Sequence, residues 1–319
     1  MSHFSVMVVT DSEPTDEILT KLMQPYHEFE CTGTDDQYVQ SIDRTEEAKA
    51  EYAQYTENAT EPAEGFLEWI NGWYGLEPVV SPADPDKEGE HKYGYVRVGA
   101  DGNVLEVITR TNPNKKWDYW RVGGRYRARL QVKSGVASAV ATEPSWEWKN
   151  EKTIPEGFDS ACVADIDWDK MKVEAQRGRA NWVDECIAKC GMSREDFGAA
   201  CQLHKEVHAK WMEIPASDRP RGSEYFQWLR DAGYANVADA HSHNFEIPEI
   251  GEQTLDDWIN SAPMLSAFAV VKDGKWYEQG EMGWWACVSN EDDQWDEKFN
   301  EMVASLQPTQ WITLLDCHI

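Results

Sequence analysis

Hydrophobic and polar positions along the chain predict strands at both ends and helices between them. The first run, His3 to Thr10, is apolar and β-branched and stops at a polar turn, as expected of a buried strand. Residues 15–23 have apolar positions at helical spacing, two acidic residues in the first turn and Pro25 behind them, so they predict a helix. The chain therefore opens with a strand followed by a helix.

The rest of the N-terminal region predicts two helices and an antiparallel sheet. Helices are expected over residues 44–55 and 62–74, the second with its large apolar residues on one side. Strands over residues 93–98 and 104–109 flank an Asp-Gly turn, which predicts a hairpin because glycine adopts the positive φ that tight turns need. Strict alternation over residues 125–132 predicts a third strand, and we expect all three strands in one sheet.

The middle of the chain has helical periodicity, and its last part returns to strands. Helices are expected over residues 170–189, 193–212, 223–232 and 255–261. Strands are expected over residues 267–272, 276–278, 283–288 and 311–317, with a helix over 292–306. The chain is therefore predicted to be an α+β protein, with antiparallel or mixed sheets at both ends and a mainly helical middle segment.

Changes in this pattern suggest where the regions meet. Residues 141–158 include two prolines and have mixed polarity, so they are predicted to be a linker. The linker separates an acidic α+β region of residues 1–140, with the hairpin and the third strand, from a helical region of residues 159–262. Residues 263–319 are expected to form a β-rich C-terminal region that can pack with the N-terminal strand.

Acidity is the strongest feature of the composition. The 319 residues carry a formal net charge of -28, and the first 92 hold 21 acidic against 5 basic residues, a net of -16. Such a surface repels phosphate backbones and anionic lipids, so direct binding of nucleic acid is disfavoured, whereas a basic protein surface is attracted. Solubility, or adaptation to a salty environment, explains the same charge without a partner.

Membrane insertion and export are not expected. No window approaches the roughly 18 consecutive apolar residues of a membrane span, and the N-terminus lacks a basic segment followed by an apolar core. The seven cysteines are scattered and include no CxxC pair, which favours free thiols in a reducing compartment. We therefore expect a cytoplasmic protein.

Candidates for protein binding lie in the acidic N-terminal region. This region also holds several of the 16 tryptophans, a residue type enriched both in cores and at interface hot spots. The acidic and aromatic residues selected for this role are Glu28, Glu30, Asp35, Asp36, Glu64, Glu68, Trp69 and Trp73.

A basic island interrupts the acidity between residues 111 and 135, where Asp118 is the one acid among seven basic residues. One hypothesis is an anion site, in which the N–H groups of a double glycine and nearby arginines hold a phosphate while a tryptophan stacks on a ring. Its residues are Lys116, Trp117, Trp120, Arg121, Gly123, Gly124, Arg125 and Arg127. The alternative, which we favour, is that the island pairs with the acidic N-terminal segment, within the chain or across a homo-oligomer.

Histidines provide candidates for metal binding. His204 and His208 lie at i and i+4 on one helix face, a spacing found in zinc sites, and His241 and His243 form a second pair. Surface histidines explain the same spacing, because the HExxH motif is absent and a third ligand has to come from elsewhere. We favour that interpretation and expect no metal or other cofactor.

The C-terminal Asp316-Cys317-His318 includes a thiol and an imidazole, the groups that cysteine catalysis uses. Neighbours on a strand point to opposite faces, so Cys317 and His318 each need another partner. His3 is available if the two terminal strands are adjacent. Packing of a terminal strand is the interpretation that we favour.

Four stretches together resemble a family of proteins encoded by tailed bacteriophages. They are Met1 to Val9, Lys116 to Tyr126, Lys272 to Trp285 and Leu314 to Ile319. The resemblance extends from end to end, although the helical middle adds little to it. The family pattern W-D-W-x-x-x-G-G-R-W is changed here by Tyr119 and Tyr126, which keep the aromatic ring and add a hydroxyl. The resemblance implies a viral setting and brings no activity with it.

These observations favour a binding protein over an enzyme. The first hypothesis is a phage-encoded inhibitor in the host cytoplasm, which associates stoichiometrically with a bacterial host or antiviral-defence protein, such as a nucleic-acid-binding or nuclease complex. The second is an enzyme or sequestering protein for a small phosphorylated or nucleotide ligand at the basic island. The third is a homo-oligomeric scaffold in which the island meets the acidic region of another subunit.

Overall fold

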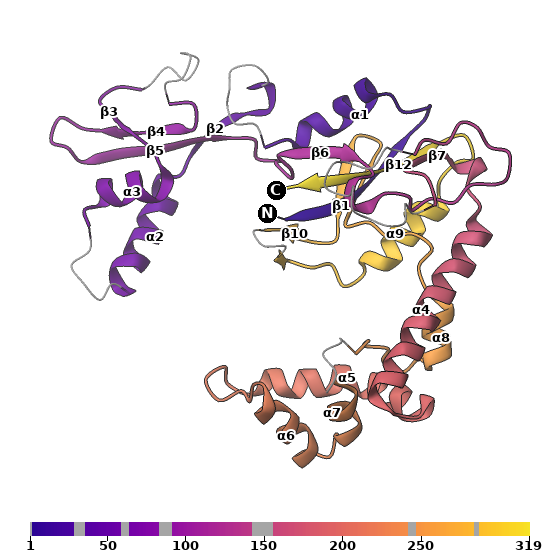
Figure 1. Ribbon diagram of the computed structural model, residues 1–319. Helices are drawn as coiled ribbons and strands as arrows, with labels where there is room; N and C mark the ends of the chain where they lie inside the picture. Colours follow the sequence, from indigo (N-terminus) through magenta and orange to yellow (C-terminus); the bar gives the residue numbers. More distant parts are fainter. Residues whose placement is uncertain are drawn as a thin grey trace, which may run out of the picture. The chain divides into compact units, whose positions relative to one another are not determined.

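A computed structural model describes residues 2–28, 36–58, 64–82, 91–141, 156–241, 247–283 and 287–319 (Figure 1). It has mixed sheets from both ends of the chain and helices in the middle, which confirms the predicted α+β class. The chain forms two compact units. The sheet unit comprises Met1–Arg129, Ala137–Ala164 and Ala267–Ile319, and the helical unit comprises Leu130–Val136 and Asp165–Ser266.

The main sheet of the sheet unit is built around the two ends of the chain. Strand β1 (His3–Thr10) pairs antiparallel with β12 (Trp311–His318) along its whole length, so the termini lie side by side (Figure 1). The strand order is β6-β12-β1-β8-β9, with β7 also paired to β12. The remaining strands are β6 (Tyr119–Val122), β7 (Ser160–Cys162), β8 (Ala269–Lys272) and β9 (Lys275–Glu278).

Apolar side chains hold helix α1 (Asp16–Met23) against this sheet. Leu19 and Met23 of the helix join a buried cluster with alternate residues of the central strands, among them Val6 and Leu315. The helix begins at Thr15, whose hydroxyl accepts a hydrogen bond from the Ile18 N–H and so satisfies one of the free donors of the first turn. On the C-terminal side, α9 (Trp295–Ala304) is anchored by its buried first indole.

A second sheet in the same unit has the order β2-β5-β4-β3. Its strands are β2 (Gln40–Asp43), β3 (Pro78–Val79), β4 (Gly94–Val98) and β5 (Val104–Thr111), so the predicted hairpin is present. Helices α2 (Thr45–Asn58) and α3 (Phe66–Tyr74) share an apolar cluster with it. A further pair, β10 (Glu281–Met282) and β11 (Val288–Ser289), stands by itself in the unit.

The predicted third strand over residues 125–132 is wrong. The strand ends earlier, as β6, and pairs with β12 instead of with the hairpin. Gly123 and Gly124 both have positive φ, and a 3-10 turn over Gly124–Tyr126 follows, so the chain cannot stay extended there. Ala128 also has a φ of 57°, which breaks the alternation that the sequence suggested.

The helical unit contains α4 (Trp168–Cys190), α5 (Arg194–Glu213), α6 (Ser223–Asp231), α7 (Ala235–His241) and α8 (Leu255–Asn260). The predicted C-terminal end of α4 is confirmed by Gly191, which adopts a left-handed C-cap conformation. The predicted start of α5 is confirmed by Ser193, whose hydroxyl accepts a hydrogen bond from the Asp196 N–H. Helix α7 was not predicted, since its short Ala-rich turn has no cap residue that marks its start. Within the described part of the chain, no helix has the length and apolar character needed to span a bilayer.

The boundaries between the regions of the chain differ from those predicted from composition. Residues 160–162 form β7 and pair with β12, so they belong to the sheet unit and not to the helical region expected from residue 159. Within the predicted linker 141–158, residues 142–155 lie outside the described part of the chain. The β-rich C-terminal residues pack with the N-terminal strand through β8 and β12.

Candidate functional site

The buried carboxylate of Asp316 joins three segments that are far apart in the sequence. Asp316 is 1% exposed, and its Oδ1 lies 2.8 Å from the His3 Nδ1 on β1. Its Oδ2 accepts from the Arg125 N–H at 3.0 Å and from the Arg121 guanidinium at 3.4 Å. A charged carboxylate at this depth needs such donors, because burying it unpaired is costly.

Gly124 makes this arrangement possible. Its φ is +53°, and a side-chain carbon placed on it would lie 2.3 Å from the Asp316 Oδ2 and 2.4 Å from the Asp316 Cβ. The preceding Gly123 N–H donates to the Leu314 carbonyl at 2.8 Å, which fixes the turn against β12. The turn at the double glycine therefore packs against an anionic side chain of the protein, but the backbone N–H that donates to this carboxylate belongs to Arg125.

The histidines of the terminal strands were candidates for a catalytic base, and their contacts do not suit that role. His3 and His318 meet edge to face at 5.0 Å between ring centroids, and His318 Nδ1 lies 2.7 Å from Asp118 Oδ1. Within the described residues, no hydrogen bond of either imidazole reaches a hydroxyl or a thiol. Cys317 belongs to the apolar cluster on the other side of the sheet, and complete burial raises the pKa of its thiol. The terminal residues thus connect neighbouring strands of the sheet by non-covalent contacts, in agreement with the interpretation that they pack a terminal strand.

Three basic residues of the island form ion pairs within the sheet unit. Lys115 forms an ion pair with Glu28, Lys116 with Glu278 at 2.5 Å, and Arg121 with Asp316. Trp117 is buried, and its Nε1–H donates to the Met23 carbonyl at 3.3 Å. Trp120 packs against it edge to face, and Arg127 lies just beyond the turn. Lys115 therefore pairs with the acidic N-terminal segment, as the charge-pairing alternative expects, whereas Lys116 and Arg121 pair with carboxylates of the C-terminal strands.

The residues selected for protein binding are spread over several places. Glu28 pairs with Lys115, whereas Glu64 and Glu68 are exposed beside α3. Glu30, Asp35 and the side chain of Asp36 lie outside the described part of the chain. Trp69 is 6% exposed and belongs to the core, and Trp73 is 71% exposed. Of the two predicted aromatic anchors, only Trp73 faces solvent.

Trp73 borders a small groove between α2 and α3. The groove has a volume of about 310 Å³ and is lined by Glu51, Gln54, Tyr55, Asn58, Trp69 and Trp73. The two indoles are stacked at 6.0 Å with an interplanar angle of 10°, and Tyr55 lies 6.1 Å from the inner one. Glu51 supplies the carboxylate of the groove and accepts a hydrogen bond from the Tyr74 hydroxyl at 2.7 Å. We call these residues the α2–α3 face.

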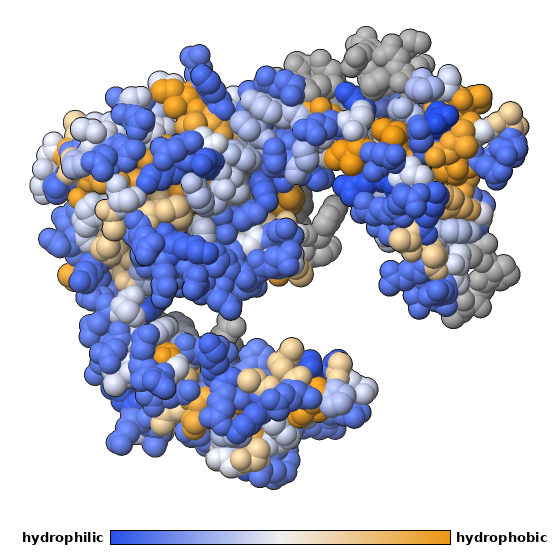
Figure 2. Space-filling view, turned by 180° about the vertical axis from the view of Figure 1, so that it is seen from behind, coloured by the Kyte–Doolittle hydropathy of each residue, from blue (hydrophilic) through white to orange (hydrophobic). Residues whose placement is uncertain are grey.

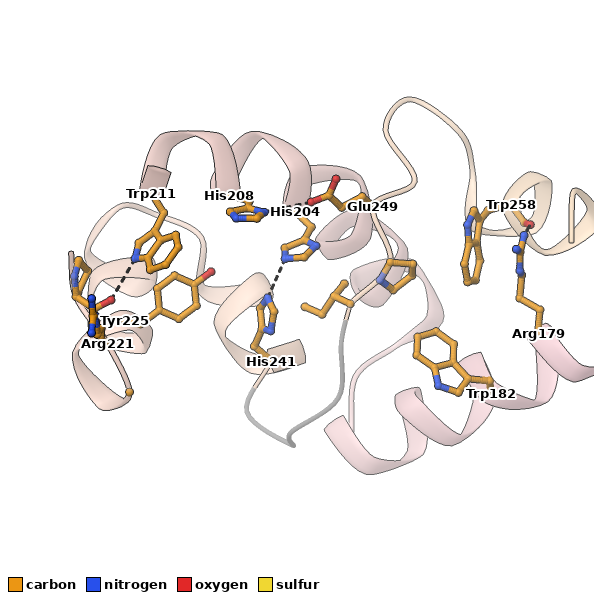
Figure 3. Close-up of a pocket in the computed structure, with 14 residues that line it drawn as sticks. Arg179, Trp182, His204, His208, Trp211, Arg221, Tyr225, His241, Glu249 and Trp258 are labelled. Carbon is orange, nitrogen blue, oxygen red and sulfur yellow. Dashed lines mark hydrogen bonds and ion pairs between the residues drawn. The ribbon is translucent and has the colours of Figure 1, made fainter. Parts of the chain in front are cut away.

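A larger cavity, of about 950 Å³, lies within the helical unit (Figure 3). Trp211, Tyr225 and Arg221 lie at one end of it, and Trp182, Trp258 and Arg179 lie at the other. The histidines on α5 and α7 occupy the middle, so helices far apart in sequence build one site. The sequence signal for this cavity was weak, because its aromatic residues have no common spacing.

Three of the four histidines considered as metal ligands line this cavity. His204 Nε2 and His241 Nε2 are 3.1 Å apart and share a hydrogen bond, and His208 Nδ1 lies 3.4 Å from Glu249. His243 lies outside the described residues. Burial, followed by the neighbouring imidazoles, lowers the pKa of His241 to about 4, so this side chain is neutral at pH 7. Among the described residues, no group of three or more His, Cys, Asp or Glu is arranged to hold a metal ion.

No protein-family model, curated protein or solved structure matches the chain. The resemblance to phage proteins therefore stays a prediction. The described parts of the four stretches that carry it lie in the sheet unit, where β1, β6, β9 and β12 are strands of the main sheet. The α2–α3 face and the cavity of the helical unit lie outside those stretches, and both have geometry suited to binding.

Proposed function

We propose that the protein is a stoichiometric binding protein that captures a basic segment of a partner protein at the α2–α3 face. The observation that carries this proposal is the exposed Trp73 ring, stacked on Trp69 beside the Glu51 carboxylate. The exposed ring is part of a contiguous aromatic cluster with Tyr55 and Trp69, and exposed apolar patches mark interaction sites more often than single exposed residues do. Aromatic rings of this kind are also the commonest hot spots of protein interfaces.

The groove suits a cationic side chain. Two indoles and a phenol present π faces or edges to it, and a carboxylate stands at its wall. A lysine or arginine held against Trp73 gains a cation–π contact and an ion pair with Glu51 at the same time. The groove volume, about 310 Å³, fits one such side chain better than a cofactor.

The surroundings of the groove attract the same kind of partner. Residues 45–75 contain seven glutamates and a single lysine, and that lysine is paired with Glu46. Most of the molecular face in Figure 2 is likewise hydrophilic. A surface of one sign raises the encounter rate with an oppositely charged partner.

The partner class follows from this chemistry together with the resemblance. A basic surface on a bacterial protein is commonly the surface that binds nucleic acid, so a bound acidic protein would compete with that substrate. The proposed function is therefore inhibition by occupancy of a host or antiviral-defence protein. No catalytic step is required of the chain.

Replacement of the exposed indole tests this function. Trp73→Ala should keep the fold, because little of the ring is buried, and should weaken the partner complex by about 2 kcal/mol, roughly 30-fold in Kd. The partner would be purified with tagged protein from infected bacterial cells, and the complex mass measured by light scattering to show its stoichiometry. Binding would then be titrated with the purified components.

The matched control is Tyr119→Ala, which removes a 55% exposed aromatic ring from β6, away from the α2–α3 face. It should leave Kd unchanged within a factor of two. Equal affinity of the Trp73 variant and the wild type would disprove the proposed face. A co-purifying second copy of this chain, dissociated by salt, would instead support the scaffold hypothesis.

A further inference from the structure

We propose that the cavity of the helical unit binds a planar aromatic molecule that carries an anionic group. This site is independent of the α2–α3 face, because it is formed entirely by residues of the helical unit. Its volume, about 950 Å³, lies at the upper end of the range for small-molecule sites.

Aromatic walls favour a planar ligand. Trp182 and Trp258 are 6.2 Å apart at one end, and Trp211 and Tyr225 are 5.7 Å apart at the other. Both pairs are inclined, at 58° and 72°, so neither pair is stacked face to face, while Arg179 lies over one face of Trp258 and Trp228 stacks on one face of Tyr225. A flat ring in the cavity can stack on one of these side chains and gain both apolar burial and ring contact.

The middle of the cavity offers a neutral hydrogen-bonding group. His204 Nε2 and His241 Nε2 share a hydrogen bond, in which one imidazole donates and the other accepts. Burial lowers the pKa of His241 to about 4, so this ring is neutral at pH 7. A neutral imidazole can orient a heteroatom of the ligand without attracting a cation or an anion.

The fixed charges around the cavity favour an anion. Two arginines and one glutamate line it, an excess of positive charge in a chain of net charge -28. Arg179 lies over the Trp258 ring at 4.1 Å and donates to the Trp258 carbonyl, so it is held in place. Arg221 is exposed at the other end, and no carboxylate of the described residues lies within ion-pair distance of it. Arg221 is therefore the group expected to meet the anion.

Two fluorescent probes that differ by one charge test this site in the full-length protein. The first is 8-anilinonaphthalene-1-sulfonate, and the second is N-phenyl-1-naphthylamine, which has the same rings without the sulfonate. Wild-type protein should bind the sulfonate at least about tenfold more tightly than the neutral probe. Arg221→Gln should reduce this ratio to about threefold or less and leave the neutral probe unaffected.

The control is Arg230→Gln, which removes the same charge from an exposed position on α6, outside the cavity, and should keep the wild-type ratio. Trp182→Leu should weaken both probes, and circular dichroism will show whether it folds. Trp73→Ala should change neither affinity, which separates this site from the proposed function. Equal affinity for the two probes in the wild type, or an unchanged ratio in Arg221→Gln, would overturn the inference.

Discussion

Gly124 shows at the scale of one residue how much of a contact a local sequence signal leaves out. A double glycine beside arginines predicts glycine N–H groups around an anion, but in the structure the Gly123 N–H donates to the Leu314 carbonyl and the Arg125 N–H donates to the carboxylate. That carboxylate belongs to Asp316, about 190 residues away in the chain, and nothing in local spacing links the two positions. The signal therefore indicated an anion near the turn, but neither its identity nor its backbone donor.

Alanine at this position should be strongly destabilising. Gly124→Ala combines a left-handed φ with a contact to the buried carboxylate, so we expect a loss of about 3 kcal/mol in the free energy of unfolding, measured by urea denaturation. Gly135→Ala is the matched control, because Gly135 has a φ of +85° and open space around it. It should cost about 1 kcal/mol, from backbone strain alone. Similar losses in the two variants would contradict a role for the Asp316 contact.

At the scale of elements, the histidine pair joins helices α5 and α7 and makes the helical unit sensitive to acid. The folded-state pKa of His241 is about 4, below its ordinary value of 6.5, so the unfolded chain binds this proton more readily. The neutral imidazole therefore favours the folded state above about pH 6.5, and this contribution is lost as the pH falls towards 4.

We expect the wild type to lose more stability between pH 7 and pH 5 than the His241→Gln variant does. After allowance for the partial exposure of the ring, the difference should be on the order of 1–2 kcal/mol by urea unfolding. His91→Asn, which removes a histidine of the sheet unit, is the control. Its pH profile should match that of the wild type, because both profiles include the protonation of the many carboxylates and of His241. Parallel pH profiles for wild type and His241→Gln would show that the imidazole is not buried as described.

Elements with local signals could be predicted, and those that depend on distant contacts could not. Hydrophobic spacing and caps were enough for α1, α4 and α5, and an Asp-Gly turn was enough for the hairpin. The false strand after Gly124 arose because alternation was counted without the positive φ values that interrupt it. The cavity histidines were selected by their spacing, but the aromatic walls depend on how five helices pack, which periodicity does not reveal.

At the scale of the whole molecule, the charge of -28 should lower the stability of the free protein but speed its association with a basic partner. Salt screens repulsion among the carboxylates, so the melting temperature of the free protein should rise between 10 and 200 mM NaCl. The same salt should slow association with a basic partner, because it screens the attraction that steers the encounter. A complex formed mainly through apolar contacts would show no such loss of association rate.

Charge reversal can show whether this steering belongs to the α2–α3 face or to the molecule as a whole. The triple variant Glu57→Lys, Glu64→Lys, Glu68→Lys changes three exposed positions on or just before helices α2 and α3, close in sequence to the residues of the face. The variant Glu195→Lys, Glu213→Lys, Glu252→Lys changes three exposed positions of the helical unit. Both move the net charge to -22, so a general field predicts equal effects on the association rate constant. A local docking site predicts a fall of about tenfold or more for the first variant and at most about twofold for the second, measured by stopped-flow mixing at low salt. Equal rates for the two variants would leave acidity as a property of the whole surface, with no preferred place for a basic partner.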